Sequence, residues 1–307
     1  MELIIEEHGK SFGKVHQARI AEIRRHLKTM TSREDAEALL ALAEALLVYS
    51  HSQVLFKRSS KELLEWLKVF LEFLRHRDEK VKVAAFQPEG AGSSFLLVNT
   101  PDVPYLVDSL KNILHQLPQR AMIISHPVFA VQRNKGLLTS LGHKVDSEFK
   151  ESFMLIQFEG IRDLDTSKIE EDIRRVLLIA QEVGSQRKTL GTRMEVLSTL
   201  AIKPHQKNFA EWLLNGNFIC FGSAAVEISK ANGGSVTARL SEDPVGWLPP
   251  SLIPTGKKAL KSLPLTATSK KLFTRKKSLV VEVLEEESPL YQQDNLIYIG
   301  YRDSSEG

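Results

Sequence analysis

The spacing of apolar residues divides the chain into an N-terminal helical part and a longer part that mixes strands and helices. Up to about Arg77, apolar residues recur every three or four positions, which is typical of amphipathic helices. We expect helices in residues 15–29, after Ser32, and after Ser59, where Ser59 and Glu62 make a capping box. The third helix has a wide apolar face, formed by Leu63, Leu67, Phe70, Leu71 and Leu74, with Trp66 beside it. Such a face needs a partner surface, either in the next domain or in another subunit.

From Lys80 the pattern changes to alternation, which predicts strands. The runs VKVAAF and SFLLVNT are strand-like, with turn residues between them, and residues 103–117 form an amphipathic stripe for which Asp102 can act as N-cap. Two further strands follow, MIISHPVFAVQ and ESFMLIQFEGI, and then a helix capped at residues 165–167. This order contains the ferredoxin-like arrangement, in which two helices cover one face of an antiparallel sheet.

A second unit begins near Pro204. Its first helix is expected to bury Phe209, Trp212 and Leu213, and the last two strands read as a hairpin around residues 291–294. The pattern therefore predicts an α+β protein with a helical segment at residues 1–78, a ferredoxin-like domain at 79–200, and a second unit at 201–307, which the family resemblance described below implies is a partial or divergent module of the same kind.

The amino-acid composition is ordinary for a soluble globular protein and does not favour a more specific class. The chain has 307 residues, 42% of them hydrophobic and 26% charged, and a net charge of +3. The single cysteine, Cys220, cannot form an internal disulfide and is expected to be a small core residue in a reducing compartment. No signal peptide and no run of about 20 apolar residues is present, so we expect a cytoplasmic protein without a membrane span.

The motifs of common enzymes are missing from the sequence. Gly90 and Gly92 make a lone G-x-G inside a hairpin turn, and there is no P-loop, H-E-x-x-H or G-x-S-x-G. His115, His126 and His143 are not at metal-ligand spacing. We therefore assign no catalytic, cofactor-binding or metal-binding residue.

The loop between the second strand and its helix offers a binding site. It combines the side chains of Asn99 and Thr100 with the free amides of a helix N-terminus, which favour a carboxylate. Asp102 could receive an ammonium group, so the two halves suit an amino acid. The alternative is that these are ordinary loop and capping residues.

One tract of the chain is strongly basic. No acidic residue lies between Asp243 and Glu282, while eight Lys and Arg residues fall within 257–277. The tract could bind phosphates or RNA, but Phe273 and Trp247 are the only aromatic residues near it. We favour a solvated loop or a surface that faces an acidic neighbouring domain over nucleic acid.

Five segments resemble one family, the large bacterial NAD-dependent glutamate dehydrogenases. PDVPYLVDSL resembles the family's D-x-P-F-L-V-D-S-V, IISHPVFAVQR its H-P-V-x-x-V-x-R, and ESFMLIQFEG its E-S-x-M-x-I strand. FAEWLLNGNFICFG is similar to F-L-x-W-L-x-x-x-x-F-x-x-L-G, and the stretch from Lys270 through NLIYIGYRD matches more weakly. The matches keep the same order over about residues 80–301.

The resemblance implies the N-terminal region of those enzymes, which carries ACT-type domains: ferredoxin-like modules that often bind amino acids and mediate subunit contacts. Both predicted ferredoxin-like units are then ACT-type. The full-length enzymes deaminate L-glutamate oxidatively to 2-oxoglutarate with NAD, but their catalytic domain lies beyond residue 307, so this chain takes no cofactor or catalytic residue from them. The implied partners are a second copy, the catalytic region of the same enzyme and an amino-acid effector.

The resemblance also locates the expected effector site. Asp102, Pro104 and the adjacent Val103 fall where ACT-type modules place their ligand loop, so the candidate residues are Asn99, Thr100, Asp102 and Val103. Pro104 and Tyr105 replace a glycine that many sensing modules use for close approach, and a proline has no amide to offer.

Two alternatives to a regulatory region stay open at this point. The first is a purely structural interaction module that uses the apolar face at residues 60–75. The second is a nucleic-acid binder that uses the basic tract.

Overall fold

The computed structural model describes residues 17–28, 33–48, 55, 57–88, 92–142, 149–159, 165–200, 203–230, 236–253, 263–290 and 294–302. The chain divides into two compact units, and each is described by itself. Unit 1 comprises residues 1–102 and 110–178, and unit 2 comprises residues 103–109 and 179–307. The domain boundaries predicted at residues 78 and 200 stay predictions.

Unit 1 begins with the predicted helices. Residues 17–27 are helical and are followed by α2 (Arg33–Val48) and α4 (Ser60–Arg75). The capping box of α4 is confirmed, because the Ser59 side chain accepts from the Glu62 amide and the Glu62 side chain accepts from the Ser59 amide. Ser32, the expected cap of α2, lies outside the described residues.

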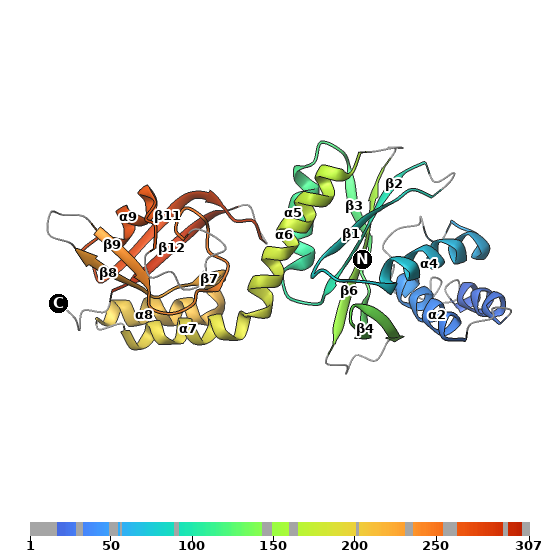
Figure 1. Ribbon diagram of the computed structural model, residues 1–307, viewed down its shortest axis with the longest axis horizontal. Helices are drawn as coiled ribbons and strands as arrows, with labels where there is room; N and C mark the ends of the chain where they lie inside the picture. Colours follow the sequence, from blue (N-terminus) through green and yellow to red (C-terminus); the bar gives the residue numbers. More distant parts are fainter. Residues whose placement is uncertain are drawn as a thin grey trace, which may run out of the picture. The chain divides into compact units, whose positions relative to one another are not determined.

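An antiparallel sheet of six described strands forms the centre of unit 1 (Figure 1). Its strands are β1 (Lys82–Phe86), β2 (Ser94–Pro101), β3 (Ala121–Ser125), β4 (Val128–Asn134), β5 (Leu137–Gly142) and β6 (Lys150–Phe158). They lie in the order β1-β2-β6-β4-β5, and β3 also pairs with β6. The elements β2, α5 (Leu106–Gln116), β3, β6 and α6 (Ser167–Ser185) give the strand-helix-strand-strand-helix pattern, with β4 and β5 inserted between β3 and β6. Strand β1 pairs with the remaining edge of β2.

Two elements differ from their predicted bounds. The strand expected over MIISHPVFAVQ ends at Ser125 and resumes at Val128, because Pro127 has no amide to donate to a neighbouring strand. Helix α5 begins at Leu106 rather than at residue 103, because Tyr105 has a left-handed φ of 76°.

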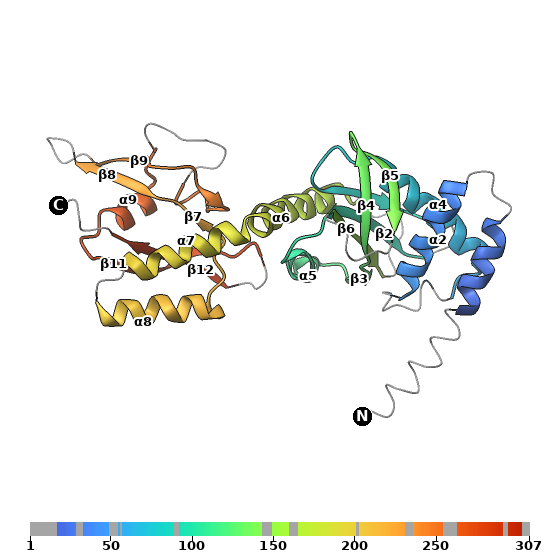
Figure 2. The ribbon, with the colours of Figure 1, turned by 90° about the horizontal axis from the view of Figure 1, so that it is seen from below.

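Both faces of the central strands are buried. On one face, α4 packs with edge-on aromatic contacts: ring centroids lie 5.3 Å apart for Trp66–Phe95 and 5.1 Å for Phe70–Phe86. Figures 1 and 2 show α5 and α6 on the opposite side of the sheet from α2 and α4. The wide apolar face of α4 therefore has its partner surface within its own unit.

Unit 2 combines helices with paired strands. Its helices are α7 (Arg187–Leu200), α8 (Pro204–Trp212), a π-helical turn (Leu213–Asn217) and α9 (Ala267–Phe273). Its described strands pair two by two and antiparallel: β7 (Gly222–Ser223) with β10 (Val245–Gly246), β8 (Val226–Lys230) with β9 (Val236–Leu240), and β11 (Leu279–Glu287) with β12 (Asn295–Tyr301). The predicted final hairpin is thus confirmed in β11 and β12.

One burial prediction in unit 2 is wrong. Leu213 is buried, but Phe209 is only half-buried and Trp212, stacked on it at 6.1 Å, is 50% exposed. The buried residues Gln206, Ala210 and Leu213 recur at helical spacing and form the inward stripe, and Phe209 and Trp212 lie beside it.

The predicted α+β class, with N-terminal helices and an antiparallel sheet covered by helices, is confirmed. No helix among the described residues is both long and apolar enough to cross a membrane.

Candidate functional site

Two of the four candidate residues, Asn99 and Thr100, lie within β2 and not in the loop that follows it, so the predicted loop placement is wrong for them, and their side chains point into the protein. Asn99 and Thr100 are 1% and 0% exposed. Asn99 Nδ2 donates to Glu151 Oε2 at 3.0 Å, and Thr100 Oγ1 donates to the Lys80 carbonyl at 3.0 Å. These side chains therefore anchor the loop from inside.

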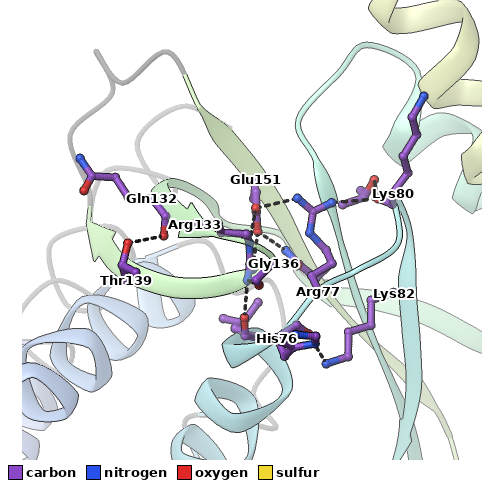
Figure 3. Close-up of polar contacts among 12 residues, drawn as sticks. His76, Arg77, Lys80, Lys82, Gln132, Arg133, Gly136, Thr139 and Glu151 are labelled. Carbon is purple, nitrogen blue, oxygen red and sulfur yellow. Dashed lines mark hydrogen bonds and ion pairs between the residues drawn. The ribbon is translucent and has the colours of Figure 1, made fainter.

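Asn99 belongs to a buried ionic cluster made by Arg77, Arg133 and Glu151, which we call the Glu151 cluster (Figure 3). Arg77 Nη2 donates to Glu151 Oε1 at 2.8 Å, and Arg133 donates to both carboxylate oxygens at 2.7 and 2.9 Å. The side chains of the two arginines are 11% exposed and that of Glu151 is 5% exposed. Burial raises the pKa of Glu151, but the hydrogen bond from Arg133 and the charges of both arginines outweigh it, so its pKa lies below the ordinary value.

Arg133 of the cluster and the nearby Lys82 bind carbonyl groups at the end of α4 and in the turn between β4 and β5. Arg133 Nη1 donates to the carbonyls of Leu74 and Gly136 at 2.9 Å, and Lys82 Nζ donates to those of Phe73 and His76 at 2.6 and 2.7 Å. Positive charge at a helix C-terminus offsets the partial negative charge of the last carbonyl groups. The cluster therefore holds the end of α4 against the sheet.

Asp102 heads a second polar chain, which lies nearer the surface. Ser152 Oγ donates to Asp102 Oδ1 at 2.7 Å and lies 3.1 Å from His126 Nε2. Burial lowers the pKa of His126, although the charge of Asp102 acts in the opposite direction. Asp102 itself is exposed, so one side of its carboxylate faces solvent while Ser152 fixes its orientation.

The residues after Asp102 have a distinct backbone. Val103 is half-buried, and a Cβ placed on Gly184 would lie 2.8 Å from the Val103 Cβ, so only glycine permits this close approach. Tyr105, with its positive φ, occupies a conformation that glycine adopts without strain. The left-handed backbone needed at position 105 explains why a glycine would suit this loop.

Sequence reasoning missed Arg77, Arg133, Glu151 and Ser152 as partners of the loop. A signal was present, because Asp102, His126, Arg133 and Glu151 are the polar positions of three separate family-like motifs. The fold brings the polar residues of these motifs together in two adjoining chains of hydrogen bonds.

The other candidate chemistry is poorly supported. Within the described parts of the chain, no group of three His, Cys, Asp or Glu residues could hold a metal ion. Burial raises the pKa of the half-buried Cys220 thiol to about 11, which makes it a poor nucleophile. In the basic tract, Lys271 and Arg275 both pair with Glu282, at 3.2 and 3.0 Å, and residues 254–262 lie outside the described residues.

Comparison with known proteins gives one match. Residues 42–173 match the family described as "Glutamate dehydrogenase, ACT1 domain". No curated protein and no solved structure matches the chain. The matched segment runs from within α2 into α6 and contains the sheet, the candidate loop and the Glu151 cluster. The match confirms, for residues 42–173, the resemblance to the ACT-type N-terminal region of a glutamate dehydrogenase.

Proposed function

We propose that this chain is a non-catalytic regulatory region of an NAD-dependent glutamate dehydrogenase and that it binds an amino-acid effector at the loop around Asp102. The family match over residues 42–173 carries the first part of the proposal. Oxidative deamination of L-glutamate, the use of NAD and a cytoplasmic location belong to the proposed full-length enzyme. No residue described above is assigned to catalysis or to NAD.

The exposed and oriented carboxylate of Asp102 carries the effector part. Ser152 holds one carboxylate oxygen, which leaves the group poised to accept hydrogen bonds from an ammonium group. Helix α5 begins four residues later at Leu106, and its first amides have no partner within the helix, which suits a carboxylate. Pro104 contributes no amide, so the carboxylate would be bound by the amides after it.

The four candidate residues then have two roles. Asp102 and Val103 would touch the ligand, whereas the buried Asn99 and Thr100 would position the loop through Glu151 and the Lys80 carbonyl. This division predicts that substitutions at Asp102 change ligand affinity, while substitutions at Asn99 change stability first.

Isothermal titration with a panel of amino acids tests the proposal. Asp102→Asn should weaken the binding of the preferred amino acid by roughly 10- to 100-fold, because a hydrogen bond to a charged group contributes about 1.5–3 kcal/mol. Asp243→Asn is the matched control, since Asp243 is exposed and lies outside both the loop and α5. Equal affinities for wild type and Asp102→Asn would refute this site, and no binding by any amino acid would refute the effector function.

A purely structural module was the main alternative. It depended on the apolar face at residues 60–75, but that face packs on the sheet of unit 1 and is not a free surface. The alternative therefore loses the observation that favoured it.

A further inference from the structure

Unit 2 contains a cavity that is larger than a folded interior normally leaves. Its volume is about 1730 Å³, whereas pockets for small ligands have roughly 300–1,000 Å³ and well-packed interiors leave few voids larger than a water molecule. Its walls come from α7, α9 and the strands β7, β8, β11 and β12. All the described residues that line it belong to unit 2, so the cavity is separate from the loop around Asp102.

Much of the cavity wall is apolar and incompletely covered by protein. Buried residues of the unit 2 core, such as Leu252, Ile253 and Phe273, line the cavity. Further apolar residues pack against this core and line the cavity but are only half-buried: Val226, Ile228, Leu248 and Leu296. Because apolar surface is stabilised by removal from water, this wall suits an apolar ligand.

Helix α7 adds another wall. Its cavity-lining residues recur at helical spacing and include Thr189, Arg193, Val196, Leu197 and Leu200. A helix in a folded domain normally buries its apolar stripe, but in α7, all of which the structure describes, Leu190 is the only buried residue. Val196 is 47% exposed. The apolar positions of α7 therefore face a space that protein atoms do not fill.

A hydrogen-bond donor lies towards one end of the cavity. A Cβ placed on Gly300 would lie 2.4 Å from the Tyr298 hydroxyl oxygen, so the tyrosine ring extends along β12 over Gly300 in the direction of Arg302. Within the described parts of the chain, the Tyr298 hydroxyl has no hydrogen-bond partner. Burial raises the pKa of Tyr298, so the hydroxyl stays protonated at neutral pH and can donate to an anion.

Positive charge gathers at the same end. The Arg302 amide donates to the Ser278 carbonyl at 2.9 Å, which brings Arg302 beside the segment that holds Lys277. Lys277 and Arg302 line the cavity and are exposed, and neither forms an ion pair with a described residue. This end therefore offers two cations and a hydroxyl to a negatively charged group.

The acidic residues of the cavity wall do not cancel this charge. Glu242 pairs with Arg193, and Glu227 pairs with Arg239. Asp294 precedes β12 and therefore lies at the opposite end of the hairpin from Arg302. The cavity thus combines an apolar wall with one basic end.

We infer that the cavity binds a long-chain carboxylate, that is, a fatty acid. Its carboxylate would be bound by Tyr298, Lys277 and Arg302, and its chain would cover the half-buried apolar residues. An amino acid would leave most of the volume unfilled, and an uncharged apolar molecule would gain nothing from the two cations. The site lies in unit 2 and does not depend on the effector proposal.

Isothermal titration of the full chain with laurate and with lauryl alcohol tests the inference, because the two ligands share one chain and differ in the charge of the head group. Wild type should bind laurate saturably and more tightly than the alcohol. Tyr298→Phe should weaken laurate binding about tenfold or more, since it removes a hydrogen bond to a charged group. Tyr301→Phe is the matched control, because Tyr301 lies on the opposite face of β12 and donates to the Gln206 carbonyl at 3.4 Å.

A charge variant tests the basic end. Lys277→Gln with Arg302→Gln should weaken laurate binding about tenfold or more and change the affinity for the alcohol by less than about twofold. Retained alcohol binding shows that the cavity is still folded. Lys276→Gln is the matched control, because Lys276 is exposed and adjacent but does not line the cavity, and it should change neither affinity.

An apolar variant tests the chain-binding wall. Ile228→Thr keeps a side chain that favours strands and should weaken both ligands about tenfold, because it removes apolar contact with the chain. Ile123→Thr is the matched control, because Ile123 is also a half-buried strand residue but belongs to unit 1.

Three results would overturn the inference: a wild type that does not bind laurate, a laurate affinity that Tyr298→Phe leaves unchanged, or a charge variant that loses the acid and the alcohol equally. None of these results bears on amino-acid binding at Asp102.

Discussion

Removal of the negative charge of Glu151 should destabilise unit 1 strongly. In Glu151→Gln the side chain keeps its size, but two buried guanidinium groups lose the carboxylate that pairs with them. Arg77 and Arg133 both contact this carboxylate at 2.9 Å or less, and both are 11% exposed. Water therefore cannot easily replace the lost partner.

The magnitude follows from this burial. Loss of one partner of a buried ion pair typically costs 3–5 kcal/mol, because an uncompensated charge is left in the interior. The two guanidinium groups also donate to the carbonyls of Leu74, Gly136 and Lys80, and these bonds should retain part of their interaction energy. We expect a loss of about 3 kcal/mol in the free energy of unfolding of unit 1.

Urea denaturation followed by Trp66 fluorescence, in a background that carries Trp212→Phe and Trp247→Phe, reports on unit 1, because Trp66 packs between α4 and the sheet. The matched control is Glu37→Gln, which breaks the pair with Arg33 at 2.9 Å, where the two side chains are 68% and 92% exposed. This control should cost no more than about 0.5 kcal/mol. A loss below about 1 kcal/mol for Glu151→Gln would refute the reasoning.

Four further outcomes can be checked with the same or simple assays. The pKa of Glu151 is lowered in the folded protein, so the carboxylate contributes its full stabilisation above the unfolded pKa of about 4.3, and this stabilisation is lost as pH falls through the folded pKa. Urea titrations at a series of pH values should therefore show that the free energy of unfolding falls more steeply on acidification for wild type than for Glu151→Gln. Phe70→Ala should cost about 3–5 kcal/mol, whereas Val69→Ala, on the exposed side of α4, should cost under about 1 kcal/mol; similar losses for both would contradict the packing described. Tyr105→Gly should be about 1 kcal/mol more stable than Tyr105→Ala, because alanine keeps the strain of a positive φ; the reverse order in thermal unfolding would argue against that backbone. Cys220, with a pKa of about 11, should react with a disulfide reagent at pH 8 far more slowly than free cysteine, since only about one thiol in a thousand is ionised there; labelling at the rate of free cysteine would disprove its burial.

Much of unit 1 could be predicted from its sequence, because local pattern and tertiary structure agree there. The strand-like apolar run of β2 and the capping box at Ser59 both locate elements that the structure has. The predicted bounds are wrong where a single residue overrides the pattern. Pro127 interrupts the predicted strand and Tyr105 delays the start of the predicted helix, although apolar residues continue at the expected spacing past both positions.

The polar cluster could not be predicted from local pattern, because its members come from distant parts of the chain. Arg77 and Glu151 are separated by 74 residues and meet only when β6 lies beside β2 and the end of α4 reaches the sheet. Asn99 was expected to face a ligand, because the sequence placed it in a loop beside the free amides of a helix N-terminus. Its burial beside Glu151 follows from strand register, which places it in the pair with Phe153.

Unit 2 was harder to predict because four of its six described strands have only two or five residues, and the strands pair only two by two among the described residues. The helix at residues 204–217 was predicted correctly as helical, but its buried stripe is formed by Gln206, Ala210 and Leu213 and not by Trp212. The hairpin of β11 and β12 was predicted because its two runs are rich in strand formers.

Hydrogen–deuterium exchange of the full chain, with and without the amino acid that binds in the titration panel, tests the central claim most directly. The account predicts slower exchange in peptides that cover residues 99–110, with Asp102→Asn abolishing the effect and the control Asp243→Asn preserving it. Protection confined to other peptides, or protection that persists in Asp102→Asn, would contradict an effector site at this loop.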